Sequence, residues 1–147
     1  MSRYALDTNL YVRAFRNAAA ADEITRFYAV HLPRCYLCSV VHHELLIGAS
    51  TPAKTRQLED DVVQTFRRTG RMFAPSARAW QTAAEVMAGL AVREKLELRT
   101  LSRSFGNDVL LAVACLEAGI TLVTENVKDF SRIARIAPFS FVSPWPT

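Results

Sequence analysis

The sequence predicts an α/β fold in which helices cover both faces of a central, mostly parallel sheet of four to five strands. Short apolar runs of strand length alternate with longer segments whose apolar residues recur at helical spacing. The 147 residues fit a single domain, 1–147, with one sizeable core. Half of the residues are hydrophobic and 22% are charged, which favours a folded globular protein.

In the first half of the chain, two strand-like runs are each followed by helical segments. The predicted elements are a strand over 2–6, helices over 9–16 and 18–30, a strand over 35–38, and helices over 40–49 and 50–68. Ser39 is a suitable N-cap for the predicted helix over 40–49. Pro52 occupies a first-turn position that helices tolerate, and Gly70 follows the last helix.

The second half continues the alternation. Its predicted elements are a strand over 72–74, a helix over 75–94, a polar basic loop over 95–104, a helix over 107–117, a strand over 120–123, a helical turn over 126–134 and an edge strand over 139–142. Gly119 is the residue type that usually ends a helix. No linker, low-complexity segment or internal repeat interrupts the pattern.

The charge balance mildly favours a nucleic-acid partner. The chain has a net charge of +4, and its basic residues are 15 arginines and 3 lysines. Arginine binds phosphates through a planar fork and stacks on bases, although a high-GC genome would enrich arginine equally well. No apolar run reaches the roughly 18 residues that a membrane span needs, and the N-terminus lacks a signal-peptide pattern, so we expect no membrane partner and a cytoplasmic location.

Two of the three cysteines form a C-x-x-C motif, Cys35 and Cys38, with His42 and His43 close behind. Zinc or redox chemistry is one interpretation. The surrounding run is strand-like, however, and residues three apart on a strand point to opposite faces. Buried structural cysteines are therefore expected.

Three acids stand out: Asp7 follows the first predicted strand, Glu44 lies one turn into the predicted helix after the second strand, and Asp108 opens a later predicted helix. In an open parallel sheet, ligands bind beyond the carboxyl ends of the strands, where these acids would meet. Carboxylates that converge repel one another unless a cation neutralises them. The simplest hypothesis is a site for a hard divalent cation, Mg²⁺ or Mn²⁺.

Each acid also has an ordinary structural explanation. Asp7 could serve simply as a helix N-cap, and Glu44 could face solvent beside His43. Asp108, placed at the start of its predicted helix, would be favoured there by the helix dipole. Its helix is nearly all apolar and hence central, which makes Asp108 the better functional candidate. Thr124, Glu125, Asn126 and Asp129 add further oxygen atoms after the last apolar run.

These segments resemble the motifs of the PIN-domain ribonucleases, especially the VapC-type toxins of bacterial toxin–antitoxin pairs. The resemblance rests on Leu6-Asp7-Thr8-Asn9, on residues 39–45 with the later Gly48, on Asn107-Asp108 and on residues 122–130. The motifs occur in family order across nearly the whole chain. In one departure, Asn126 stands where many members carry aspartate, and Asp129 could supply the missing carboxylate.

The resemblance implies a PIN-like three-layer fold and Mg²⁺-dependent hydrolysis of RNA, with Mn²⁺ as a substitute ion. The expected catalytic residues are Asp7, Glu44, Asp108, Thr124 and Asn126. The expected metal ligands are Asp7, Glu44, Asp108 and Asp129. The resemblance also implies a homodimer, a heterotetramer or larger assembly with antitoxin, and a cognate VapB-type antitoxin whose C-terminal segment covers the acidic site.

Basic residues before Asp108 are candidates for delivering RNA phosphates to the site. The candidate RNA-binding residues are Asn9, Arg93, Arg99 and Arg103, with Lys95 in the same basic segment. The alternative is a solvated loop in which Glu94 and Glu97 are local partners.

Other functions fit the sequence less well. A haloacid-dehalogenase-like phosphatase needs a second aspartate where Asn9 stands, and both it and a receiver domain need a lysine on a late strand. A zinc module would have to use Cys35, Cys38 and His42. The non-enzyme alternative is a non-catalytic PIN-like RNA-binding protein, which the amide at Asn126 keeps open.

Overall fold

The central sheet is parallel throughout and has the strand order β3-β2-β1-β4-β5. The structure, a computed structural model, describes residues 1–95, 97, 99 and 101–147. The strands are β1 Tyr4–Leu6, β2 Cys35–Cys38, β3 Met72–Phe73, β4 Thr121–Val123 and β5 Phe141–Val142. The predicted α/β class is confirmed, with β5 as the expected edge strand.

The register of the two central strands decides where the polar residues that follow them lie. Tyr4 is opposite both Cys35 and Thr121, and Leu6 is opposite Val123. The backbone N–H of Asp7 extends this ladder by donating to the carbonyl of Val123 at 3.0 Å. Residues directly after β1 and β4 therefore meet at the carboxyl edge of the sheet.

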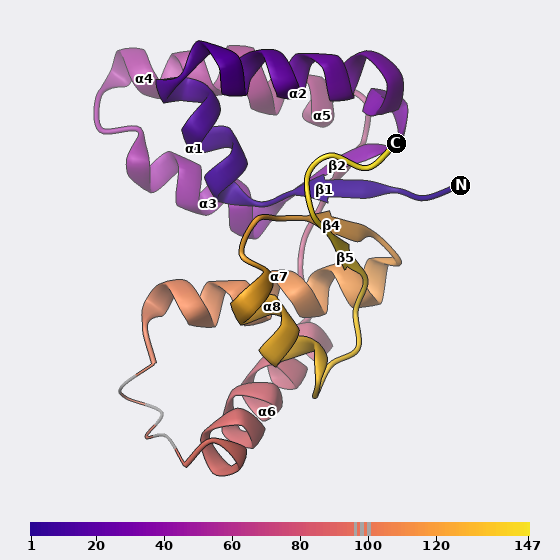
Figure 1. Cartoon of the computed structure of the whole chain (residues 1–147). Helices are drawn as coiled ribbons and strands as arrows, with labels where there is room; N and C mark the ends of the chain where they lie inside the picture. Colours follow the sequence, from indigo (N-terminus) through magenta and orange to yellow (C-terminus); the bar gives the residue numbers. More distant parts are fainter. Residues whose placement is uncertain (96, 98, 100) are drawn as a thin grey trace.

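Helices form layers on both sides of the sheet (Figure 1). They are α1 Thr8–Arg16, α2 Ala18–His31, α3 Ser39–Gly48, α4 Pro52–Leu58, α5 Gln64–Arg68, α6 Ala77–Arg93, α7 Arg103–Ala118 and α8 Val127–Ala134, with a 3₁₀ turn η1 Leu32–Arg34 and a π-helical segment η2 Glu59–Val63. In Figure 1, α1, α2, α4 and α5 lie above the sheet, and α6, α7 and α8 lie below it.

Helix α7 begins earlier than the sequence predicts. The polar stretch before Asn107 was expected to be loop, but the helix starts at Arg103 because Ser102 caps it. The Ser102 hydroxyl accepts a hydrogen bond from the backbone N–H of Phe105 at 3.0 Å. The expectation that Asp108 lies at the helix start is therefore wrong, since it lies one turn further in.

The middle of α7 is the most enclosed part of the helix layer. Every residue from 108 to 115 is buried, which agrees with the predicted central position. The helix packs on α6 and α8 and also contacts α3 and β4. Gly119 ends it with φ +66°, a left-handed conformation that glycine adopts without strain.

Two smaller expectations about helices need correction. Ser39 does not cap α3 but is its first helical residue, and Cys38 precedes it with an extended backbone and no capping side-chain bond. The predicted helix over 50–68 is helical over 52–68, but its middle widens into the π-helical η2. Its N-cap is Thr51, whose hydroxyl accepts from the N–H of Lys54.

The cysteines are buried, as the strand interpretation predicts. Cys35 and Cys38 are each 1% exposed in β2, and the Cys35 thiol donates to the carbonyl of His31. Burial raises the pKa of both thiols to about 11. Within the part of the chain that the structure describes, none of the helices has the length and apolarity that crossing a bilayer requires.

Candidate active site

A polar cavity of about 110 Å³ lies at the carboxyl edge of β1 and β4. Its lining residues are Asp7, Thr8, Asn9, Glu44, Ser102, Ser104, Phe105, Asp108, Asn126 and Asp129. The fold therefore brings together residues from four distant segments of the chain. The three acids selected from the sequence, and Asp129, all line this one cavity.

Asp7 combines a structural role with its place in the site. It is 4% exposed and caps α1, since one carboxylate oxygen accepts from the N–H of Thr8 at 2.8 Å. The other oxygen accepts from the Thr124 hydroxyl at 2.7 Å. Burial raises the pKa of Asp7 and the charge of Glu44 adds to the rise, whereas the bonds from Thr124 and Thr8 oppose it. Both carboxylate oxygens are thus held in fixed directions.

Glu44 projects from α3 toward the cavity rather than into solvent. Its oxygens accept from the Thr8 hydroxyl at 2.6 Å and from the Asn107 side-chain amide at 3.3 Å. These partners precede and follow it by 36 and 63 residues, so they come from the start of α1 and from α7. The solvent-facing alternative for Glu44 does not hold.

Asp108 is the acid most strongly affected by its surroundings. It is 9% exposed. Burial, followed by the negative charges of Asp7, Glu44 and Asp129, raises its pKa from the ordinary 3.8 to about 8. Near neutral pH, the site therefore holds a proton on Asp108 unless a cation offsets the charge of its neighbours.

Thr124 and Asn126 connect the acids. Thr124 is fully buried, and its hydroxyl accepts from the backbone N–H of Asn126 at 3.0 Å while donating to Asp7. The Asn126 side-chain nitrogen is 3.4 Å from an oxygen of Asp108 and 3.3 Å from one of Asp129. Asn126 thus acts as a hydrogen-bond donor between two carboxylates.

Asp129 has a cationic partner that reasoning from the sequence missed. Arg132 of α8 places Nη1 at 3.2 Å from a carboxylate oxygen of Asp129. The i, i+3 spacing of these two residues on a helix was the available signal. Arg132 also pairs with Glu94 just after α6.

The carboxylate oxygens of the site suit a hard divalent cation, although the acids do not form a close group of ligands. Among the described residues, no three His, Cys, Asp or Glu side chains form a group that could hold a metal ion. The acids nevertheless act on one another electrostatically in one small polar cavity. Carboxylate oxygens are what Mg²⁺ prefers, and Mg²⁺ keeps several of its waters, so few direct ligands are needed.

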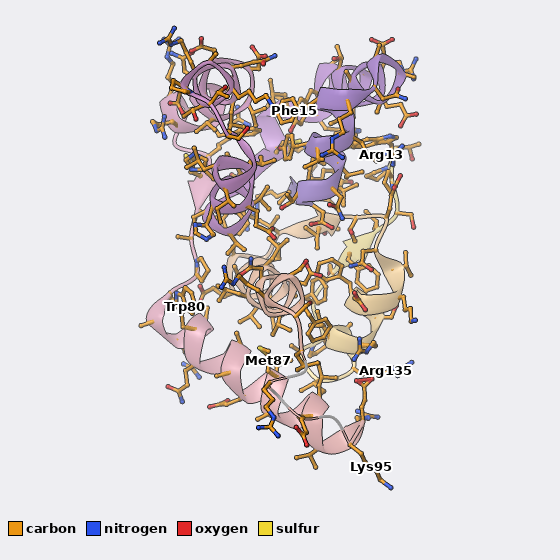
Figure 2. All side chains as sticks on the ribbon, turned by 90° about the vertical axis from the view of Figure 1, so that its left-hand side faces the viewer. Arg13, Phe15, Trp80, Met87, Lys95 and Arg135 are labelled. Carbon is orange, nitrogen blue, oxygen red and sulfur yellow. The ribbon has the colours of Figure 1, made fainter. Side chains whose placement is uncertain are left out.

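The predicted basic residues Arg93, Arg99 and Arg103 do not line the cavity. Arg93 ends α6 and Arg103 begins α7, while Arg99 is highly exposed and pairs with Glu97 at 2.8 Å. Figure 2 shows Lys95 and Arg135 at the same end of the molecule, with Trp80 at the opposite end of α6. Closer to the site, Arg13 of α1 pairs with Glu125.

A wall of the cavity was not predicted from the sequence. Ser102, Ser104 and Phe105 line it because α7 begins at Arg103. Ser102, a residue type favoured at the N-cap, was the signal that could have revealed this start. Thr8 and Asn107, known beforehand only as parts of motifs, prove to hold Glu44.

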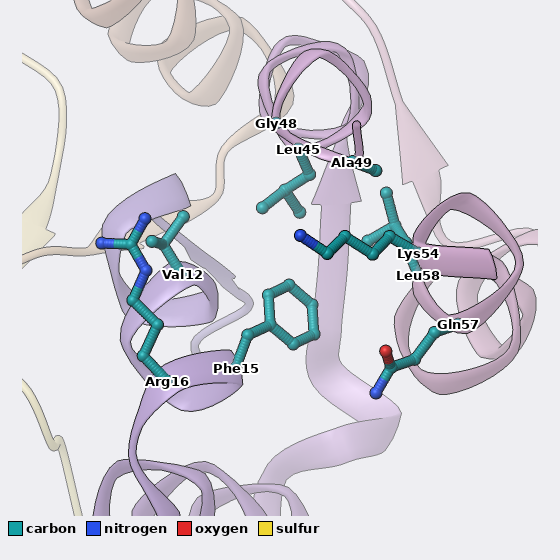
Figure 3. Close-up of a pocket in the computed structure, with 9 residues that line it drawn as sticks. All are labelled: Val12, Phe15, Arg16, Leu45, Gly48, Ala49, Lys54, Gln57 and Leu58. Atoms are coloured by element: carbon teal, nitrogen blue, oxygen red, sulfur yellow. The ribbon is translucent and has the colours of Figure 1, made fainter. Parts of the chain in front are cut away.

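A second cavity, of about 310 Å³, lies between α1, α3 and α4. Its lining residues are Val12, Phe15, Arg16, Leu45, Gly48, Ala49, Lys54, Gln57 and Leu58. Figure 3 shows the Phe15 ring, Leu45 and the amine end of Lys54 directed into this space, with the guanidinium of Arg16 at its edge. Phe15 is 48% exposed, so this apolar pocket with basic groups is open to solvent.

Several solved structures share the fold. One is VapBC2 from Rickettsia felis bound to a promoter DNA fragment, with 22% identity and a TM-score of 0.63, covering 97% of this chain and 98% of that chain. Another is DNA-bound VapBC from Salmonella typhimurium, with 20% identity and a TM-score of 0.71, covering 97% of this chain and 98% of that chain. A third is FitAcB from Neisseria gonorrhoeae, with 18% identity and a TM-score of 0.70, covering 98% of this chain and 99% of that chain. The TM-scores establish similarity of fold, and the low sequence identities limit the comparison to the fold.

The sequence comparisons give the family. Among curated proteins, no sequence matches this chain. The family model described as PIN domain matches residues 4–136, which include the three acids, Thr124, Asn126 and Asp129. The chain belongs to the PIN-domain family.

Proposed function

We propose that this protein is a Mg²⁺-dependent endoribonuclease and acts as the toxin of a toxin–antitoxin pair in the cytoplasm. The observation that carries the proposal is the convergence of Asp7, Glu44 and Asp108 in one polar cavity, where burial and the neighbouring charges raise the pKa of Asp108 to about 8. Membership of the PIN-domain family and the fold shared with VapBC complexes support it.

The three acids would hold the cation, directly or through water, and Mn²⁺ could replace Mg²⁺. The bound ion would polarise the scissile phosphoryl group and lower the pKa of the attacking water. Thr124 keeps Asp7 in place, and Thr8 and Asn107 keep Glu44 in place. Because each acid is fixed by a neutral donor, its negative charge remains available to a cation.

The chain's other polar groups would bind the substrate. Asn9 lines the cavity, Arg93 and Arg99 precede the cavity wall at 102–105 in the sequence, and Arg103 lies within that wall segment. Arginines placed there would bind the phosphates of single-stranded RNA on either side of the cut.

The regulatory partner would be a VapB-type antitoxin that covers the acidic site, within a homodimer or heterotetramer. The 310 Å³ pocket supports this, since its apolar lining, with Arg16 and Lys54 beside it, suits an acidic amphipathic segment. The pocket and the acidic site both border α1 and α3, so one segment can reach both.

The proposal is tested by incubating purified protein, free of antitoxin, with total RNA and Mg²⁺. The matched variants are Asp7→Asn and Asp108→Asn, which keep side-chain shape and remove charge, together with an EDTA control. We expect discrete fragments from the wild type alone. If the wild type binds RNA but cleaves none with Mg²⁺ or Mn²⁺, the protein is instead a non-catalytic PIN-like RNA-binding protein.

A further inference from the structure

Arg132 lies at the junction of three helices beside the candidate site. Its Nε and Nη2 bind the two carboxylate oxygens of Glu94 at 2.9 and 2.7 Å, and its Nη1 binds Asp129 at 3.2 Å. Its guanidinium carbon is 4.8 Å from the ring centroid of Phe105. Only 23% of the Arg132 side chain is exposed. The guanidinium is thus fixed by two acids and one aromatic face.

This arrangement occupies both oxygens of Asp129. Oδ1 accepts from Arg132, and Oδ2 accepts from the amide of Asn126. Asp7, Glu44 and Asp108 differ, because in the part of the chain that the structure describes none of them forms an ion pair with Lys, Arg or His. Their partners are neutral hydroxyl and amide groups. The four acids therefore divide into one paired and three unpaired carboxylates.

We propose that Arg132 is a positioning residue of the site, which holds Asp129 in a paired state so that Asp7, Glu44 and Asp108 alone bind the divalent cation. The inference rests on the proposed function and departs from the expectation that Asp129 is a metal ligand. Asp129 then serves to orient the Asn126 amide, which in turn contacts Asp108. The site has three anionic ligands in this arrangement.

A purely structural role for Arg132 would have a different signature. Its bonds to Glu94 and its contact with Phe105 join the end of α6 to the start of α7, so removing it lowers thermal stability in either case. Metal affinity separates the two roles, because only the positioning role predicts that a freed Asp129 changes cation binding.

The experiment is a Mn²⁺ titration of the purified, metal-free full chain, with free Mn²⁺ measured by electron paramagnetic resonance. The variants are Asp129→Asn, Arg132→Met, Asp108→Asn and Glu94→Gln. We expect Asp129→Asn to bind Mn²⁺ within about threefold of wild type. Loss of a direct ligand in Asp108→Asn is expected to weaken binding by more than about 100-fold, since loss of an outer partner of a metal ligand already costs about 10- to 100-fold.

Arg132→Met keeps an unbranched apolar stem but releases an unpaired carboxylate into the site. The added negative charge is expected to tighten Mn²⁺ binding by about three- to tenfold. Glu94→Gln is the matched control, since it weakens the other ion pair of Arg132 and leaves Asp129 paired, and its Mn²⁺ affinity should equal that of the wild type.

Weakening by Asp129→Asn as large as that by Asp108→Asn would make Asp129 a ligand and overturn the inference, with the proposed function intact. Absence of Mn²⁺ binding in the wild type would instead overturn the proposed function and this inference with it. Circular dichroism establishes that each variant is folded. Should Arg132→Met be unfolded, the comparison of Asp129→Asn with Asp108→Asn decides the question.

Discussion

At the scale of single residues, Asp108 links protonation to folding. The unfolded chain ionises this carboxyl near its ordinary pKa of 3.8, whereas the native site retains the proton up to about pH 8. Because the native state binds the extra proton, the stability gained from it is complete below about pH 4 and is lost as the pH rises toward 8. The metal-free protein therefore loses stability through this group on going from about pH 5 to about pH 8.

Asp108→Asn removes this dependence, since the amide resembles the protonated acid. On going from about pH 5 to about pH 8, we expect the wild type to lose on the order of 3 kcal/mol of unfolding free energy that the variant keeps. Urea denaturation in EDTA at the two pH values measures the difference. An equal change in unfolding free energy between the two pH values in both proteins would mean that Asp108 ionises normally. Asp60→Asn, an exposed change on η2, is the surface control.

Sequence reasoning identified the acids of the cavity but not what holds them. Asp7, Glu44 and Asp108 could be selected because Asp7 follows a strand-like run and the other two are acids in largely apolar helical segments, which is local information. The Thr8–Glu44 and Arg132–Glu94 contacts join segments 36 and 38 residues apart. Such partners depend on how helices pack, so residue types and spacing alone did not reveal them.

At the scale of elements, the capped start of α7 forms one wall of the site. Replacing Ser102 with alanine removes the acceptor for the Phe105 N–H and should cost about 1 kcal/mol. The loss falls on the first turn, which carries Ser104 and Phe105. Thermal unfolding and amide hydrogen exchange of residues 103–106 measure it.

Ser104→Ala is the control for this prediction, because Ser104 is exposed in the same turn and is not the N-cap. Equal loss of protection in both variants would show that the cap does not stabilise the turn.

The sequence predicted that α7 begins only at Asn107, because the basic run before it lacks the apolar periodicity that marks a helix. The start of α7 at Arg103 is set by the Ser102 cap, which apolar periodicity does not reveal.

The apolar pocket between α1, α3 and α4 should control partner binding without controlling chemistry. Phe15→Glu places a charge in the pocket and is expected to weaken binding of a co-expressed VapB-type antitoxin by at least about tenfold. Co-purification measures the complex, and RNA cleavage by the isolated variant should equal that of wild type. Val30→Glu, an exposed apolar position on α2 outside the pocket, is the control.

At the scale of the whole molecule, the proposed cation site predicts that a cation stabilises the fold, because it would bind acids from three separate segments. Binding to the native state alone adds about 2.7 kcal/mol when Mg²⁺ is present at about 100 times its Kd. Differential scanning calorimetry should show a rise in Tm for wild type and a much smaller one for Asp108→Asn. NaCl at equal ionic strength separates binding from screening, and an equal rise with NaCl would contradict a specific site.

The class of the fold was predictable from the sequence, whereas the order of the strands was not. Alternation of strand-like and helical segments is visible in the sequence and implies a parallel sheet. That β1 lies between β2 and β4 depends on pairing between residues 4–6 and 121–123, which share no local signal. The family resemblance implied a PIN-like three-layer fold but gave no strand order.

The position of β1 between β2 and β4 has a consequence for synthesis. Asp7 leaves the ribosome well before its Thr124 partner, which follows β4 and lies 117 residues later in the chain. An emerging chain that has paired β1 with β2 still lacks Asp108, Thr124 and Asn126. The nascent chain therefore has no complete acidic site until residues 108–126 have emerged, and, for the proposed ribonuclease, the message being translated is spared until then.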